Sequence, residues 1–210
     1  MTKNDQRDEG YVKFDCSLEQ GPSPDWSIIQ QLNRWREKLY KMKLIGAYPD
    51  GIGFGNLSLR SGADDRFVIS GTATGNLSAL SADHYTEVVD FDISRNYLTC
   101  RGHIRASSES MTHGSLYLLN GDTRAVIHVH HQALWDRLLN QVPTTRPSVA
   151  YGTPAMAAEM DRLYQESDLP KEKIVVMGGH REGIVTFGET LDLAGALLMH
   201  YYSILPAQDR

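Results

Sequence analysis

The chain has 210 residues, 41% of them hydrophobic, and a formal net charge of −5 at pH 7. This length and composition suit one large domain, and the acidic balance, with Lys and Arg scattered along the chain, argues against a nucleic-acid partner. No apolar run reaches the ~20 residues of a membrane span, and the polar start lacks the apolar segment of a signal peptide. We therefore expect a cytoplasmic protein that acts on a small molecule without membrane contact, with Cys16 and Cys100 as reduced thiols.

The first helix is predicted from the residues around position 25. Residues 1–22 are polar and aperiodic, which predicts a flexible N-terminal extension before a single domain over 23–210. Ser23, Pro24 and Asp25 then offer an N-cap, a proline at the first helical position and an acid in the first turn. A long helix ending near Gly46 is indicated by apolar residues at helical spacing: Trp26, Ile29, Leu32, Trp35, Leu39 and Met42.

From Gly51 onward the pattern changes to short strands separated by turns, interleaved with helices. In chain order we expect strands at 56–60, 66–70, 87–93 and 97–100, a helix at 108–120, a strand at 125–130, a helix at 132–140, a helix opened by Thr153 and Pro154, strands at 173–177 and 184–187, and a helix at 190–203. Hairpin-rich strands with helices before, between and after them predict an α/β fold with three αβα layers, in which helices cover both faces of a central, largely antiparallel sheet.

The strand at 125–130 carries two histidines one residue apart. Because side chains alternate along a strand, His128 and His130 leave the same face, while Ala125, Ile127 and Val129 point to a core on the other. Two imidazoles at that separation can converge on one divalent metal. The alternative is a pair of hydrogen-bonded surface histidines.

Two further segments bear on this pair. Ser107 and Ser108 suit a helix N-cap, and Glu109 follows in the first turn, where the helix dipole favours an anion; the alternative is a cap with an exposed pair between Glu109 and His113. The glycine-rich turn at 177–183 holds up His180, which could supply a third metal ligand, although an ordinary hairpin turn explains it as well.

Two loops are rich in small hydrogen-bonding side chains. Residues 55–58 and 70–76 place hydroxyl and amide groups beside glycines, which suits a phosphate or carboxylate without a basic residue. Two ordinary turns are the alternative. Neither loop matches a P-loop or a dinucleotide fingerprint.

In this order, the Gly55 to Ser58 loop, Thr74 with Gly75, the Ser-Ser-Glu segment, the His-x-His strand and the strand at 183–188 resemble the class II aldolase/adducin family. The resemblance implies a central antiparallel sheet between helices, a homotetramer and a divalent metal, zinc above all, with Mn²⁺, Fe²⁺ or Co²⁺ as alternatives. The implied metal ligands are His128, His130 and His180, with Glu109 as the catalytic acid/base that also touches the metal. The implied substrate-binding residues are Asn56, Thr74, Gly75, Ser107 and Ser108.

The chain departs from the family pattern at the third ligand. In the family a histidine directly precedes the glycine that opens the last strand, whereas here Glu182 holds that position and His180 lies two residues earlier. We favour His180, since three histidines suit zinc. The catalytic tyrosine of some members has no clear counterpart, and core burial explains the candidates Tyr151, Tyr201 and Tyr202 equally well.

The function expected from the resemblance is a metal-dependent aldolase-type lyase. It would act on a small phosphorylated sugar or keto acid through a metal-stabilised enediolate, with Glu109 moving the proton. A sugar phosphate epimerase or dehydratase on the same site, and a non-catalytic adducin-like binding or scaffold domain, are the alternatives.

Overall fold

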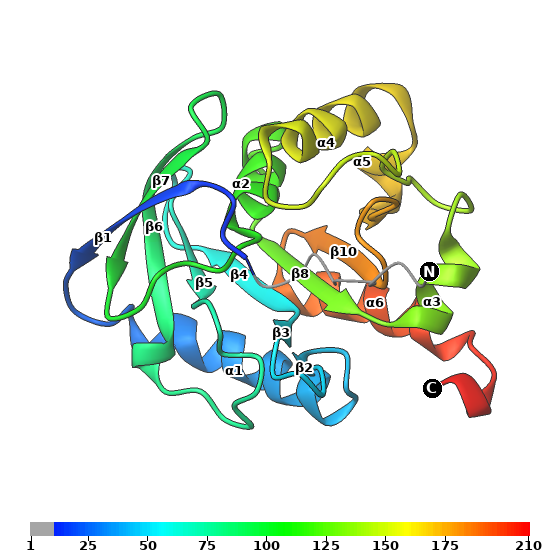
Figure 1. Cartoon of the computed structure of the whole chain (residues 1–210), viewed down its shortest axis with the longest axis horizontal. Helices are drawn as coiled ribbons and strands as arrows, with labels where there is room; N and C mark the ends of the chain where they lie inside the picture. The colour runs from blue at the N-terminus through cyan, green and yellow to red at the C-terminus, as the bar shows by residue number, and fades with distance from the viewer. Residues whose placement is uncertain (1–10) are drawn as a thin grey trace, which may run out of the picture.

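The computed structural model describes residues 11–210 and has a mixed eight-stranded sheet at its centre (Figure 1). Its strand order is β1-β7-β6-β5-β4-β8-β10-β9, and every neighbouring pair is antiparallel except β1 with β7. The strands are β1 (Asp15–Gln20), β4 (Asn56–Arg60), β5 (Phe67–Ser70), β6 (Tyr85–Asp92), β7 (Tyr97–Gly102), β8 (Ala125–His130), β9 (Ile174–Val176) and β10 (Gly183–Gly188). A separate ribbon pairs β2 (Gly46–Ala47) with β3 (Gly53–Phe54).

Helices cover both faces of the sheet, which confirms the predicted three-layer αβα fold (Figure 1). One face packs against α1 (Trp26–Lys41), α3 (Gln132–Leu138) and α6 (Leu191–Ser203). The other packs against α2 (Ser110–Leu119), α4 (Pro154–Glu166) and α5 (Leu169–Glu172). Short 3₁₀ turns lie at Ala82–His84 and Ala207–Asp209.

The strand with the two histidines lies inside the sheet, between β4 and β10, and every residue of it is buried. Ala125, Ile127 and Val129 belong to the core under α1 and α6. The alternation predicted from the sequence therefore holds, and it turns His128 and His130 to the face of α2 and α4.

The N-terminal part of the chain differs from the sequence expectation. Residues Asp15–Gln20, placed by the sequence in a flexible extension, form edge strand β1 in parallel register with β7. Phe14 is buried in the core beneath this pair, and the pairing brings the free thiols of Cys16 and Cys100 to 3.6 Å. A parallel partner far along the chain leaves no local hairpin signal, which is why the sequence did not reveal it. The earlier part of the predicted extension lies outside the described residues.

The first helix begins two residues later than the sequence pattern suggested. Asp25 is its N-cap rather than a first-turn residue, because its carboxylate accepts a hydrogen bond from the backbone N–H of Ser27. Ser23 and Pro24 therefore precede the helix.

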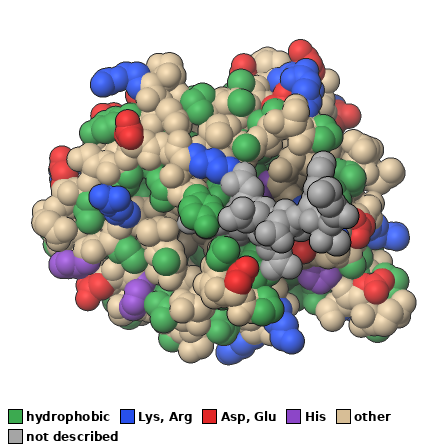
Figure 2. Space-filling view, in the orientation of Figure 1, with side chains coloured by type: hydrophobic (Ala, Val, Ile, Leu, Met, Phe, Trp, Pro, Cys, Tyr) green, Lys and Arg blue, Asp and Glu red, His purple; other side chains and the backbone are tan. Residues whose placement is uncertain are grey.

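The charged side chains are interspersed over the face shown in Figure 2, with no broad patch of one sign. This distribution gives no basic surface for nucleic acid on that face. Within residues 11–210, no helix has both the length and the apolar character to cross a membrane.

Candidate active site

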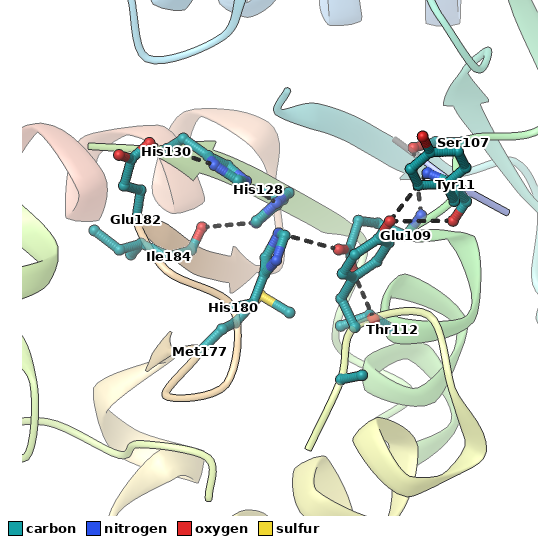
Figure 3. A network of polar contacts seen from close by, with 12 residues as sticks. Tyr11, Ser107, Glu109, Thr112, His128, His130, Met177, His180, Glu182 and Ile184 are labelled. Atoms are coloured by element: carbon teal, nitrogen blue, oxygen red, sulfur yellow. Dashed lines mark hydrogen bonds and ion pairs between the residues drawn. The ribbon is translucent and has the colours of Figure 1, made fainter. Parts of the chain in front are cut away.

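Three buried histidines converge on the face of the sheet covered by α2 and α4 (Figure 3). His128 and His130 come from β8, and His180 comes from the turn between β9 and β10. One ring nitrogen from each lies within 4.8 Å of the others. Imidazole nitrogens at this spacing can bind one divalent cation.

The hydrogen bonds behind His128 and His130 fix which ring nitrogens face the centre. Tyr48 donates its hydroxyl proton to Glu182 Oε2 at 2.7 Å, so its oxygen accepts from His130 Nδ1 at 2.9 Å. His128 Nδ1 donates to the carbonyl oxygen of Ile184 at 3.2 Å. Both Nε2 atoms are therefore unprotonated acceptors, yet they lie 3.0 Å apart.

Two lone pairs at that distance repel each other unless a cation lies between them. Burial lowers the pKa of His128 to about 4, so this ring does not supply a bridging proton at neutral pH. The donor set thus fits a divalent metal ion, with the second nitrogen of each ring held by a hydrogen bond as metal-binding histidines require.

The turn at 177–183 brings His180, and not Glu182, to this centre. A Cβ atom on Gly183 would lie 2.6 Å from His180 Cδ2 and 3.3 Å from His128 Cε1, so only glycine leaves room for both rings. Glu182 has a φ of +70°, uncommon for a residue with a side chain, and its carboxylate lies on the outer side of His130, 4.0 Å from Nδ1.

Glu109 lies beside the histidines at the N-terminus of α2. Its Oε2 accepts from Thr112 Oγ1 at 2.8 Å, and its Oε1 lies 3.6 Å from His180 Nε2 with no hydrogen-bond partner among residues 11–210. Burial raises the pKa of this carboxyl to about 7, against smaller lowering effects of Thr112 and the Lys13 ammonium. A carboxyl group with this pKa can both take up and release a proton near neutral pH.

The loops that the sequence singled out line one cavity of about 210 Å³. All five predicted substrate-binding residues are on its wall: Asn56, Thr74, Gly75, Ser107 and Ser108. Asn56 is the neighbour of His128 across the β4–β8 pair, which places the cavity next to the histidines. The lining includes no Lys, Arg, Asp or Glu from the described part of the chain, so its polar character comes from hydroxyl, amide and backbone groups.

His113 lies outside this site, in the core. It bonds through Nδ1 to the Ser58 hydroxyl at 2.7 Å, and that hydroxyl also bonds to Tyr117 at 2.7 Å. The sequence suggested that His113 and Glu109 lie on the same face of one helix. In the structure, His113 nevertheless does not join the other three histidines.

Of the three candidate tyrosines, only Tyr151 is near the histidines, with its ring centroid 4.6 Å from that of His180. Its hydroxyl accepts from the backbone N–H of Tyr11 at 3.0 Å and also bonds to the carbonyl of Tyr11 at 3.2 Å. Tyr201 instead donates to Glu172, and Tyr202 packs on His131.

Sequence reasoning missed three residues at the site: Tyr48, Tyr11 and Lys13. Tyr11 lines the cavity, and the Lys13 ammonium lies 3.8 Å from the Tyr151 ring centroid. The charge of Lys13 also helps to lower the pKa of His180, after the larger effect of burial. No motif marks these positions, because Tyr48 stands in an irregular loop and the other two precede β1.

The fold and site together define a three-layer αβα protein with a histidine centre beside an uncharged, donor-rich cavity. Residues 49–204 match the family model described as the class II aldolase and adducin N-terminal domain, so the chain belongs to this family, as its motif order predicted. No curated protein sequence matches the chain.

Solved structures with the same fold share little sequence with the chain. An L-fuculose 1-phosphate aldolase superposes with a TM-score of 0.65 at 18% identity, covering 89% of this chain and 93% of its own. YgbL from Escherichia coli, a candidate aldolase/epimerase/decarboxylase, gives 0.60 at 17%, covering 87% and 95%. A sugar-phosphate aldolase from Thermotoga maritima gives 0.53 at 13%, covering 86% and 97%.

Proposed function

We propose that this protein is a metal-dependent aldolase-type lyase that acts on a small phosphorylated sugar or keto acid. The observation that carries the proposal is the pair of histidine Nε2 acceptors held 3.0 Å apart, with His180 and the buried carboxyl of Glu109 beside them. Membership of the class II aldolase family supports the same reaction type.

The proposed cofactor is Zn²⁺, with Mn²⁺, Fe²⁺ or Co²⁺ as alternatives, held by His128, His130 and His180. Three imidazole ligands suit zinc and leave a position for substrate. When bound, the metal would act as a Lewis acid that polarises a carbonyl and its adjacent hydroxyl.

The protein's own residues would bind the substrate and move the proton. The hydroxyl, amide and backbone donors of the cavity would hold the substrate's phosphate, which orients its carbonyl end toward the histidines. Glu109 would accept the proton of the substrate's hydroxyl group on Oε1 when the carbon–carbon bond breaks, and would then return it to the carbanionic carbon that cleavage leaves, while Thr112 holds Oε2 in place. The burial of Glu109 keeps water away from that transfer.

The names of the solved structures with this fold indicate which reaction types to test. They include aldolases and a candidate aldolase/epimerase/decarboxylase, so we place bond cleavage next to a carbonyl at the centre of the proposal and include epimerisation in its test. We also propose a homotetramer, by resemblance to the family.

Metal analysis of the purified protein is the first test. The wild-type chain should carry about one divalent metal per chain, and the double variant His128→Ala/His130→Ala should carry none. Equal metal content in both would refute the metal site.

A screen for retro-aldol cleavage of sugar phosphates and 2-keto acids is the second test, with Glu109→Gln as the matched variant. Cleavage that depends on both metal and Glu109 supports the lyase. Epimerisation without cleavage would favour the epimerase, and metal binding without any turnover would favour a non-catalytic binding domain.

A further inference from the structure

The loop that carries Thr74 and Gly75 is held from behind by α1. Arg36 donates through Nη2 to the carbonyl oxygen of Thr74 at 3.1 Å and to that of Gly75 at 3.4 Å. One helical turn later, the Tyr40 hydroxyl donates to the carbonyl oxygen of Asn76 at 3.4 Å. Three consecutive carbonyl groups of the loop are thus turned toward the helix.

This arrangement decides where the loop's N–H groups point. In a trans peptide unit the C=O and N–H bonds point in opposite directions, and no cis peptide bond occurs within residues 11–210. With the carbonyls of Thr74 and Gly75 turned to Arg36, the N–H groups of Gly75 and Asn76 point away from it. Neither N–H has a hydrogen-bond partner among the described residues, and Gly75 lies on the cavity wall.

Arg36 also brings a positive charge close to a cavity without charged lining. Its side chain is only 1% exposed, and among the described residues no carboxylate lies within ion-pair distance of it. Nη1 has no hydrogen-bond partner there, while the guanidinium lies 4.6 Å from the Tyr40 ring centroid. Guanidinium groups stay charged when buried, and a buried charge without a counter-ion is costly.

We propose that Arg36 is the cationic positioning residue of this cavity, whose counter-ion is the phosphate monoester of the substrate. It acts through the Thr74–Gly75 backbone: it holds the carbonyls back, presents the Gly75 N–H to the anion, and adds a buried positive charge behind the loop. The cavity therefore selects phosphorylated ligands over ligands that lack the phosphate group. This inference rests on the proposed function in assigning the cavity to the substrate's phosphate.

Calorimetric titration of the metal-loaded protein with 2-phosphoglycolate and with glycolate tests the proposal. Glycolate lacks the phosphate group, so comparing the two ligands isolates its contribution. The variants are Arg36→Met, which removes charge and hydrogen bonds at similar volume, and Arg36→Lys, which keeps the charge alone.

Arg60→Met is the matched control. Arg60 is also buried, donates to the carbonyls of Thr123 and Tyr117 and lies 5.0 Å from a tyrosine ring centroid. It differs from Arg36 in that it forms an ion pair with Asp65 and bonds to none of the described residues that line the cavity. It therefore reports the general effect of losing a buried arginine.

We expect Arg36→Met to weaken 2-phosphoglycolate binding at least tenfold and glycolate binding less than twofold, with metal content unchanged. Arg36→Lys should lie between this variant and the wild type, and Arg60→Met should bind both ligands as the wild type does. Equal weakening of both ligands, equal weakening by Arg60→Met, or unchanged affinity in Arg36→Met and Arg36→Lys would each overturn the proposal. Phosphate-dependent binding by a wild-type protein without lyase activity would refute the proposed function and leave the role of Arg36 standing.

Discussion

Replacing Tyr48 by Phe removes a hydroxyl that joins His130 to Glu182 and should weaken metal binding without removing any proposed ligand. The hydroxyl accepts from His130 Nδ1 at 2.9 Å and donates to Glu182 Oε2 at 2.7 Å, whereas Glu182 itself is 4.0 Å from that nitrogen. Without the bridge, the ring loses the contact that fixes its tautomer. Loss of such a partner typically costs 10–100-fold in metal affinity, or about 1.4–2.7 kcal/mol.

The measurement is the apparent Kd for Zn²⁺, determined at fixed pH by competition with a chromophoric chelator. Tyr201→Phe is the control, because it removes a tyrosine hydroxyl bonded to a glutamate, Glu172, from a half-buried position on α6 that is not near the three histidines. This control should stay within twofold of the wild type. A folded Tyr48→Phe variant that binds Zn²⁺ as tightly as the wild type would show that Tyr48 does not orient His130.

Three further predictions concern the ligand set and stability. His180→Ala should lose bound metal while Glu182→Gln retains it at reduced affinity, as metal analysis would show; the opposite result would make Glu182 the third ligand. The Glu159 carboxylate binds Arg162 and Arg146, which lowers its pKa from 4.5 to about 2, so it stabilises the fold above pH ~4.5 and loses this effect as the pH falls toward 2. Glu159→Gln should therefore lower the free energy of unfolding by about 1–2 kcal/mol at pH 7, a figure reduced because solvent screens the exposed Arg146, and by less at pH 3. An equal loss at the two pH values would show that the effect does not come from the charge of Glu159. Gly195→Ala would place a Cβ 2.3 Å from Trp35 Cη2 between α6 and α1, costing about 1–3 kcal/mol in thermal unfolding, whereas Gly121→Ala meets nothing within 4 Å and should be nearly neutral.

Local patterns predicted most of the fold. Alternation along residues 125–130 was sufficient to predict a buried strand with both histidines on one face, because the pleat sets that geometry whatever the partner strands are. The strand β1 escaped prediction because its stability comes from Cys16 and Leu18 packing over a distant parallel neighbour. Its own residues carry no turn or hairpin signal.

Candidate site residues could be predicted where they belong to a sequence motif. They could not be predicted where only packing of the folded chain brings them to the site. Sequence spacing alone indicated the serines and glutamate before α2 and the two histidines of β8. Tyr48 and Arg36 did not, since each acts through a contact made by the folded chain: one behind an imidazole, the other behind a loop backbone. Supporting residues of this kind are recognised only when the elements they join are placed together.

The edge strand β1 has a consequence for how the site can be altered. The segment that leads into it carries Tyr11 to the cavity and Lys13 to Tyr151, while the three histidines come from residues 128–180. This part of the cavity wall and the three histidines therefore come from separate stretches of chain. The same segment also reaches the histidine centre, because Tyr11 bonds to Tyr151, whose ring packs on His180, and the charge of Lys13 lowers the pKa of His180. Variation in this short segment therefore offers a way to alter the cavity wall and the electrostatics of the centre while leaving the three histidines in place.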